Sequence, residues 1–131
     1  MKKKYQYKTR VYYEDTDAGG IVYYANYLKF IERARTEMIY ELLEMTHQRL
    51  KKDFNVGFVV KLCNIKYIKP AYFEDEITVF TETISKTPVR LKLLQEIRNF
   101  NELLVTASVE LAVINTNGNI QKLPQKLFDK L

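Results

Sequence analysis

The sequence is poor in the residues that most catalytic and metal sites use. It contains one histidine, one cysteine and two serines, Ser85 and Ser108. His47 and Cys63 are too few for the usual zinc ligand sets. The serines lie in a predicted turn and a predicted strand, and His47 lies at the far end of a predicted helix. A Ser-His-Asp or Cys-His arrangement therefore has poor material, and we expect no metal site.

Long apolar runs and cysteine pairs are also absent. No apolar run approaches the roughly 18 residues that a membrane-spanning helix needs. The N-terminal segment MKKKYQYKTR is basic but no apolar stretch follows it, so a secretory signal is not expected. Cys63 has no second cysteine with which to form an internal disulfide. We therefore expect a cytoplasmic protein with a buried thiol.

What is present is typical of an ordinary globular chain. Hydrophobic residues make up 47% and charged residues 28% of the sequence, and its 131 residues predict one domain, residues 1–131. The net charge of +5 favours an anionic partner. A membrane surface or a phosphate-bearing small molecule would fit that charge. Nucleic acid is not expected, because none of the usual recognition motifs occurs.

Hydrophobic periodicity predicts an α+β fold. From Tyr27 to Thr46, apolar residues recur at steps of three and four, which is typical of an amphipathic helix of roughly 30 Å. Asn26 is a candidate N-cap for this helix, and Pro124 lies near the start of a second, short helix. Alternating patterns predict strands over residues 5–13, 57–70, 75–84, 89–97 and 103–114.

Short connections between the later strands predict an antiparallel meander. One apolar face of this sheet should wrap the long helix, since each needs the other for burial. Some apolar residues fall on the opposite face of the strands. These residues are Tyr67, Phe80, Ile84, Leu94 and Ile114. They predict a further buried surface, most simply an oligomer interface.

The strongest chemical signal is the segment YYEDTDAGGIVYYANYLKF near the N-terminus. Its acids Glu14, Asp15 and Asp17 precede two glycines and the start of the predicted helix. The first N–H groups of a helix have no internal partner and lie at the positive end of its dipole, so they can polarise a carbonyl oxygen. Glycines allow the backbone to approach a ligand closely. A nearby carboxylate can then activate water or attack the polarised carbon, which is the chemistry of acyl transfer.

The same acids also suit a purely structural role. Asp residues before glycine commonly form turns, and acids near a helix N-terminus stabilise it through the dipole. Spacing alone does not separate this role from catalysis.

At these residues the sequence resembles the hotdog-fold acyl-CoA thioesterases of the 4-hydroxybenzoyl-CoA type. The likeness is closest to the bacterial branch associated with the Tol–Pal envelope system. It is strongest over residues 10–37, which include YYEDTDAGGIVYYANYLKFIERARTE, and it continues more loosely through VVKLCNIKYIKPAYFEDEITVFTETI, RLKLLQEI and LLVTASVELAVI. The resemblance implies an antiparallel sheet of about five strands wrapped around one long central helix.

The resemblance also implies roles for single residues. Asp17, in the D-x-x-G segment before the helix, would be the nucleophile or general base, and Glu14 and Asp15 would be structural acids. The backbone N–H of Tyr24 would polarise the thioester carbonyl. Many members of the Tol–Pal branch have histidine at the position of Tyr24, so any assistance from that histidine is missing here. The substrate-binding residues that we expect are Gly20, Val22, Val59, Val60, Lys61 and Arg90.

Some of these assignments have alternatives. Val59 and Val60 could line the acyl pocket or belong to an ordinary core. Lys61 and Arg90 could hold the phosphates of coenzyme A or be solvated strand residues. The sequence also does not say whether Asp17 attacks carbon or activates water, or which acyl group is preferred.

We therefore expect hydrolysis of acyl-CoA to the free acid and CoA, without a cofactor, in a homotetramer built from hotdog dimers. Acyl carrier protein is a second candidate partner. A non-catalytic module that binds acyl-CoA or acyl carrier protein in envelope or lipid assembly is an alternative function. A hotdog dehydratase is another, but such enzymes usually rely on a histidine near the helix.

Overall fold

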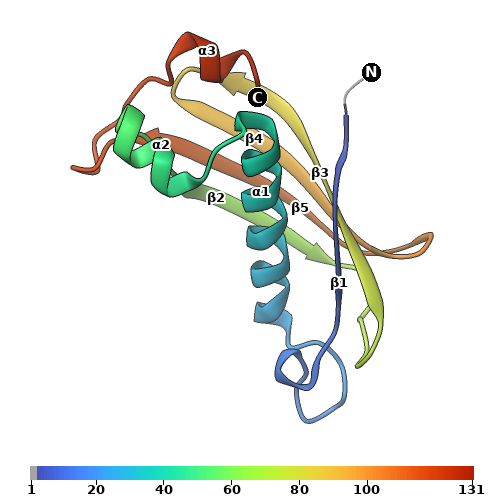
Figure 1. Ribbon diagram of the computed structural model, residues 1–131. Helices are drawn as coiled ribbons and strands as arrows, with labels where there is room; N and C mark the ends of the chain where they lie inside the picture. Colours follow the sequence, from blue (N-terminus) through green and yellow to red (C-terminus); the bar gives the residue numbers. More distant parts are fainter. Residues whose placement is uncertain (1–2) are drawn as a thin grey trace.

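Five strands form one antiparallel sheet around a long helix in the computed structural model, which describes residues 3–131 (Figure 1). The sheet has the order β1-β3-β4-β5-β2, so β1 and β2 are its two edges. In chain order the elements are β1 (Tyr5–Arg10), η1 (Tyr13–Asp15), η2 (Tyr24–Asn26), α1 (Tyr27–Leu43), α2 (His47–Phe54), β2 (Gly57–Tyr67), β3 (Glu76–Thr87), β4 (Arg90–Asn99), β5 (Glu102–Ile114) and α3 (Gln125–Phe128). The predicted α+β fold is confirmed.

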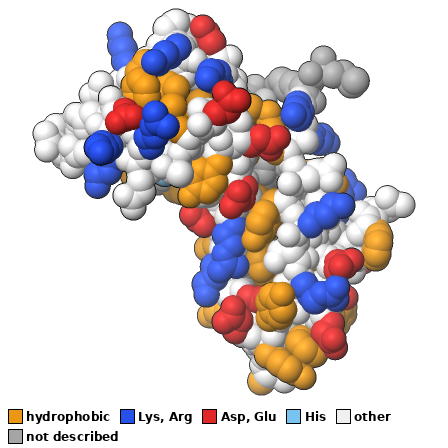
Figure 2. Space-filling model, in the orientation of Figure 1, with side chains coloured by type: hydrophobic (Ala, Val, Ile, Leu, Met, Phe, Trp, Pro, Cys, Tyr) orange, Lys and Arg blue, Asp and Glu red, His pale blue; other side chains and the backbone are white. Residues whose placement is uncertain are grey.

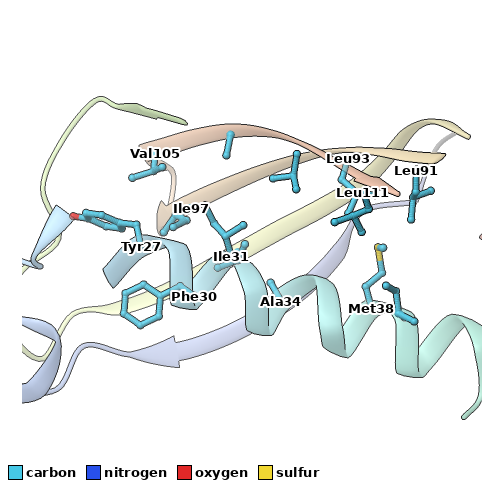
Figure 3. Packing of buried hydrophobic residues seen from close by; sticks show 14 of the residues in the cluster. Tyr27, Phe30, Ile31, Ala34, Met38, Leu91, Leu93, Ile97, Val105 and Leu111 are labelled. Carbon is cyan, nitrogen blue, oxygen red and sulfur yellow. The ribbon is translucent and has the colours of Figure 1, made fainter. Parts of the chain in front are cut away.

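The core lies between α1 and the inner face of the sheet. Figure 3 shows Ile31 and Met38 of α1 directed toward Leu93, Ile97 and Leu111 of the strands. All five side chains are at most 2% exposed. Burying an apolar side chain of this size contributes about 1.5–3 kcal/mol, so this contact fixes α1 against the sheet.

One polar contact also joins the helix to the sheet. The buried Gln95 amide nitrogen donates to the carbonyl oxygen of Ile31 in α1 at 3.0 Å and to the hydroxyl of Thr81 at 2.9 Å. A buried donor without a partner would cost about 1–3 kcal/mol, so these bonds restrict the position of α1 more sharply than apolar packing alone.

The path of β2 differs from the predicted meander. β3, β4 and β5 are neighbours in sequence order, but β2 pairs with β5 rather than with β3. The loop of residues 68–75 therefore crosses from one edge of the sheet to the strand beside the other edge. α1, which lies between β1 and β2 in the chain, also crosses the inner face of the sheet and joins its two opposite edges.

A β-bulge changes which way the second half of β2 faces. The register shifts between Val60 and Leu62, so Lys61 has no partner on β5. Because successive side chains in a strand alternate between faces, one extra residue reverses that alternation. Tyr67 consequently pairs with the buried Val105 and lies on the helix side of the sheet. The prediction that Tyr67 belongs to the outer face is wrong.

The long helix ends three residues earlier than the predicted boundary at Thr46. α1 ends at Leu43, where Glu44 adopts a left-handed conformation with φ of 54°. A second helix, α2, follows, with Thr46 as its N-cap and His47 as its first residue. His47 is half-buried against the ring of Tyr40, at the end of α1 far from the acidic loop (Figure 1). No helix among residues 3–131 is long and apolar enough to cross a membrane.

The environments of Cys63 and Asn26 differ from those predicted. Cys63 is exposed on β2, so the prediction of a buried thiol is wrong for this chain. Asn26 precedes α1 at the expected N-cap position, but its side chain makes no capping hydrogen bond. The outer face of the sheet does carry the half-buried apolar residues Phe80, Leu94 and Ile114.

Candidate active site

The acidic segment forms a tight turn between β1 and α1. An isolated β-bridge joins Thr16 to Val22, and within it the Asp17 amide donates to the carbonyl oxygen of Ile21 at 2.9 Å. The turn closes with the Gly20 amide donating to the Asp17 carbonyl oxygen at 3.1 Å. Gly20 has φ of +82°, a conformation that residues with a Cβ adopt only with strain. This glycine is therefore required by the turn itself.

Asp17 is exposed at the start of that turn. One carboxylate oxygen, Oδ1, accepts a hydrogen bond of 2.8 Å from the Gly19 amide. The other oxygen has no partner among the described residues, 3–131, and is free to meet a proton donor or an electrophile. Nothing in the fold buries this carboxylate, so both its catalytic and its turn-forming roles are compatible with its position.

Asp15 has a different environment, because it is only 5% exposed and both of its oxygens are used. Oδ2 accepts from the Tyr12 amide at 2.9 Å, and Oδ1 accepts from the Asn26 side-chain nitrogen at 2.6 Å. Its carbonyl oxygen accepts from the Tyr23 amide at 2.9 Å. Asp15 therefore ties the end of β1 to the start of the helix, and this contact explains why the Asn26 side chain does not cap α1.

Tyr24 is the first residue of η2, the short helical turn that leads into α1. Neither its backbone N–H nor that of Ala25 has an acceptor within the part of the chain that the structure describes. The Tyr24 side chain is exposed, and its carbonyl oxygen accepts a hydrogen bond of 3.1 Å from the hydroxyl of Tyr67. Two unpaired amides at a helix start can receive a partly negative oxygen.

Tyr24 also lines an apolar cavity of about 280 Å³. Its walls include the aromatic side chains of the helix start and of the end of β2, together with aliphatic residues of the turn, and they are Tyr24, Tyr27, Tyr67, Ile21, Val22 and Ile68. A cavity of about 150 Å³ is large enough to hold benzene. The space lined by Tyr24 can therefore hold a small acyl group.

Tyr27 forms the buried back of this cavity. Its hydroxyl oxygen accepts a hydrogen bond of 3.0 Å from the Ala71 amide, and the Ala71 carbonyl oxygen accepts one of 2.9 Å from the Val22 amide. Burial raises the pKa of Tyr27, which therefore stays protonated at neutral pH. This arrangement joins the loop after β2 to the turn that carries Asp17.

Exposed aromatic side chains surround the same end of the molecule. They come from the acidic loop and from the loop after β2, and they are Tyr12, Tyr13, Tyr23, Tyr24 and Tyr72. Figure 2 shows hydrophobic side chains gathered over the lower end of the molecule, where Figure 1 places the loop before α1.

The expected site residues fall into two groups. Gly20, Val22 and Tyr24 lie with Asp17 at one end of the sheet. The other group is at the opposite end, where β2 and β4 begin, and consists of Val59, Val60, Lys61 and Arg90. Residues in register share a row across the sheet, and Arg90 and Val59 both pair with Ala112 of β5.

The second group is separated from Asp17 within one chain. Arg90 lies at the end of β4 opposite to Arg98, whose partner Thr78 is near the acidic loop, and eight strand residues span roughly 25 Å. Arg90 forms an ion pair of 2.8 Å with Glu110. Val59 and Val60 are 38% and 47% exposed, so they are not part of the core of this chain. Their roles in substrate binding stay predictions.

A five-stranded antiparallel sheet wrapped around one helix, with a carboxylate turn at the helix start, defines the hotdog class of protein. Residues 11–131 match the family model of the thioesterase-like superfamily, so the chain belongs to that superfamily. The acyl-CoA thioesterase YbgC of Haemophilus influenzae is 39% identical over 111 residues, which are 85% of this chain and 81% of that protein. The acyl-CoA thioester hydrolase YbgC of Escherichia coli O6:H1 is 39% identical over 109 residues, which are 83% and 80% of the two chains.

Solved structures agree with this assignment. A probable thioesterase from Bartonella henselae superposes with a TM-score of 0.89 at 33% identity, over 93% of this chain and 100% of that one. The hotdog fold and the family resemblance expected from the sequence are thereby confirmed.

Two residues of this end of the molecule had no signal in the sequence. Tyr27 reads as an ordinary apolar residue of an amphipathic helix, and its contact with Ala71 joins residues 44 positions apart. Tyr67 reads as an outward-facing strand residue unless the bulge at Lys61 is known. Both contacts depend on tertiary register, which local periodicity does not contain.

Proposed function

We propose that this protein hydrolyses acyl-CoA thioesters to the free acid and CoA. The observation that carries the proposal is one juxtaposition. Tyr24, whose amide is unpaired, lines an apolar cavity, and Asp17 is bonded through its own amide to Ile21, another lining residue. The names of relatives that are 39% identical over most of the chain support the same reaction.

The geometry suggests how the thioester is activated. The acyl group enters the cavity, and its carbonyl oxygen accepts a hydrogen bond from the Tyr24 N–H. This amide lies at the positive end of the dipole of α1, so it stabilises the negative charge that develops on the oxygen during attack. Removal of one such donor in other enzymes costs about 10²–10³ in rate, which is the scale of its contribution.

Asp17 supplies the carboxylate by one of two routes. As a general base, it takes a proton from water, the water oxygen bonds to the carbonyl carbon, and the C–S bond breaks to release the CoA thiolate, which then takes up a proton. As a nucleophile, its oxygen bonds to the carbonyl carbon, the thiolate leaves, and water hydrolyses the resulting anhydride. After hydrolysis in ¹⁸O-labelled water, label in the carboxylate of Asp17 identifies the second route, because it enters only when water attacks the aspartyl carbon of the anhydride.

Replacement of Asp17 by Asn tests the proposal. Asn keeps the shape of the side chain and can still accept from the Gly19 amide, but it neither takes a proton nor attacks carbon effectively. We expect thiol release from a panel of short, long and aromatic acyl-CoAs to fall by about 10²–10⁴-fold. The assay is colorimetric detection of free CoA thiol under saturating substrate.

The matched control is Asp53→Asn, on the exposed surface of α2, where Asp53 pairs with Arg49 and with no other residue among 3–131. This variant should hydrolyse at the wild-type rate. Near-normal thiol release by Asp17→Asn would remove Asp17 from the mechanism. Tight binding of acyl-CoA by the wild type without any thiol release would favour the non-catalytic binding module instead.

Pairing of β2 with a second copy would bring the two groups of site residues together. β2 is an edge strand whose outer edge has no partner within the described chain, and it exposes Val60 and Leu62. In a two-fold antiparallel pairing, the start of one β2 lies beside the end of the other. Val59, Val60 and Lys61 of one copy would then approach the cavity of its partner, which supports a hotdog dimer as the unit of a homotetramer.

The remaining expectations are part of the same proposal. Acyl carrier protein as an alternative donor of the acyl group, a role beside the Tol–Pal envelope system, a cytoplasmic location and a single domain over residues 1–131 stay predictions. Arg90 and Lys61 stay candidates for contact with the phosphates of CoA, in keeping with the net charge of +5.

A further inference from the structure

Tyr67, the last residue of β2, makes a specific contact with the candidate active site. Its hydroxyl donates to the carbonyl oxygen of Tyr24 at 3.1 Å, across 43 positions of sequence. The tyrosine ring also borders the cavity. Its centroid lies 6.2 Å from the ring centroid of Tyr24 and 5.6 Å from that of Tyr27. No other side chain among residues 3–131 forms a hydrogen bond to the backbone of η2.

The position of this hydrogen bond has a chemical consequence. The carbonyl group of Tyr24 shares its peptide unit with the N–H of Ala25, so a donor on that oxygen polarises this N–H and makes it a stronger donor itself. The same bond limits rotation of the peptide plane. Because the Tyr24 N–H is one Cα atom away, its direction depends on that plane as well.

Both amides concerned are the unpaired ones described above. A 3₁₀ turn is a short and poorly bonded element, and its first N–H groups have no internal partner to hold them in place. A hydroxyl anchored on a strand can supply that restraint. Tyr67 is 44% exposed, and its partial burial, with Tyr24 and Cys63 as further causes, raises the pKa of the hydroxyl, which keeps its proton throughout the neutral range.

We propose that Tyr67 is a positioning residue for thioester hydrolysis: its hydroxyl holds the Tyr24–Ala25 turn so that the unpaired amides of this turn point at the substrate carbonyl. The inference rests on the proposed function, because it assigns the same amides the same role. It differs from a cavity-wall role, in which the ring alone contacts the acyl group.

Replacement of Tyr67 by Phe removes the hydroxyl and keeps the ring. A neutral hydrogen bond of this kind contributes an amount that corresponds to about a 3- to 10-fold change in rate. We expect kcat to fall by about that factor while KM stays within about twofold, because the lost effect is larger in the transition state than in the bound substrate. Unchanged kcat and KM would indicate a cavity-wall role of the ring alone and overturn the proposal, and a rise in KM with unchanged kcat would overturn it as well.

Tyr40→Phe is the matched control. Tyr40 lies near the far end of α1, and its hydroxyl has no hydrogen-bond partner in the described part of the chain. This variant should keep wild-type kcat and KM. A similar fall in kcat for both variants would attribute the effect to general loosening of the fold and would also overturn the proposal.

A second measurement reads the turn without any hydrolysis. In ¹⁵N-labelled protein, the amide signals of Ala25 and Tyr24 should shift in Tyr67→Phe but not in Tyr40→Phe. An unchanged Ala25 amide overturns the positioning role, whatever the activity. A shifted amide with unchanged kcat overturns its link to catalysis. Failure of the wild type to release thiol would overturn the proposed function instead, and the amide measurement separates the two cases.

Discussion

Gly19 holds a place where any side chain would reach the Asp17 carboxylate. A Cβ atom at this position would lie 3.2 Å from Oδ1 of Asp17, which is tighter than most real contacts of this kind. The backbone of Gly19 is not in the left-handed region, so conformation alone does not require glycine here. A methyl group there would displace the carboxylate by a few tenths of an ångström, which gives a way to move the Asp17 side chain without replacing it.

We expect Gly19→Ala to lower kcat/KM for acyl-CoA by about 10- to 100-fold. The added methyl group pushes the carboxylate away from its position, and small misplacements of a reacting group carry losses of this order. The thermal midpoint should change little, because the residue is exposed and its backbone conformation suits alanine. Steady-state kinetics and a thermal melt measure the two quantities.

Gly57→Ala serves as the control for this substitution. Nothing lies within 4 Å of a Cβ atom built at Gly57, so its methyl group meets open space. Wild-type kinetics for Gly19→Ala would show that the position of the Asp17 carboxylate does not matter for the reaction.

Asp15 and Asp17 show why a list of acids in one segment is not yet a site. The two are separated by one residue, yet one is buried with both oxygens bonded and the other is exposed with one oxygen free. Nothing in the letters EDTDAGG distinguishes them. The family resemblance chose Asp17, while the local environment of each carboxylate came only from the fold.

Among the elements, the connection of Tyr27 in α1 to Ala71 in the loop after β2 fixes the cavity wall. The Ala71 amide is fully buried, and the Tyr27 hydroxyl oxygen is its acceptor. This hydrogen bond joins two elements distant in sequence, and loss of the hydroxyl oxygen leaves a buried donor without a partner.

Tyr27→Phe should lower the free energy of unfolding by about 1–3 kcal/mol at neutral pH, the usual cost of an unpaired buried group. The difference from wild type should narrow at high pH. Burial raises the pKa of Tyr27 in the folded state, whereas the unfolded chain releases this proton near pH 10. The contribution is thus fully present below that pH and is lost as the pH rises through the folded pKa.

Urea unfolding of both proteins between about pH 7 and about pH 11 measures this difference, with the phenylalanine variant correcting for the other lysines and tyrosines that titrate there. A difference in unfolding free energy that stays constant over this pH range would mean that the hydroxyl of Tyr27 is no more buried than in the unfolded chain.

The elements themselves were largely predictable from the sequence. Alternation located β1 to β5, and the three- and four-residue repeat located α1, because both patterns reflect burial against one face. α2 was missed, since Leu50 is its only fully buried residue and gives no periodic signal. The predictions of the partner of β2 and of the face occupied by Tyr67 were wrong for the same reason. Strand order and bulges are properties of the assembled sheet, which local sequence patterns do not contain.

For the molecule as a whole, the exposed edge of β2 is its most consequential surface. Long unpaired edges with apolar side chains readily pair with another chain. Leu62 lies in the middle of β2, is 54% exposed and would meet its own copy in a two-fold pairing centred on the strand. The proposed dimer, and through it the completeness of the site, can therefore be tested at one position.

Leu62→Lys should dissociate the proposed dimer, because it places like charges opposite each other across the pairing. We expect a smaller particle by sedimentation velocity and a parallel loss of thiol release, since Val59 and Val60 of the partner would be withdrawn from the cavity. Phe100→Lys, at the exposed β4–β5 turn and off this edge, should change neither. A wild-type particle mass for Leu62→Lys would place the interface elsewhere.

The bulge at Lys61 also bears on how this protein tolerates change in length. Before the bulge, the even-numbered residues of β2 face the helix, as Phe58 and Val60 do. After the bulge, the odd-numbered residues face the helix, as Ile65 and Tyr67 do. Exchange of the side chain at position 61 leaves that phase intact, whereas deletion of a single codon there would turn Tyr67 outward and turn Asn64 and Lys66 toward the helix. In grafting or shortening this strand, the number of residues is the quantity to conserve.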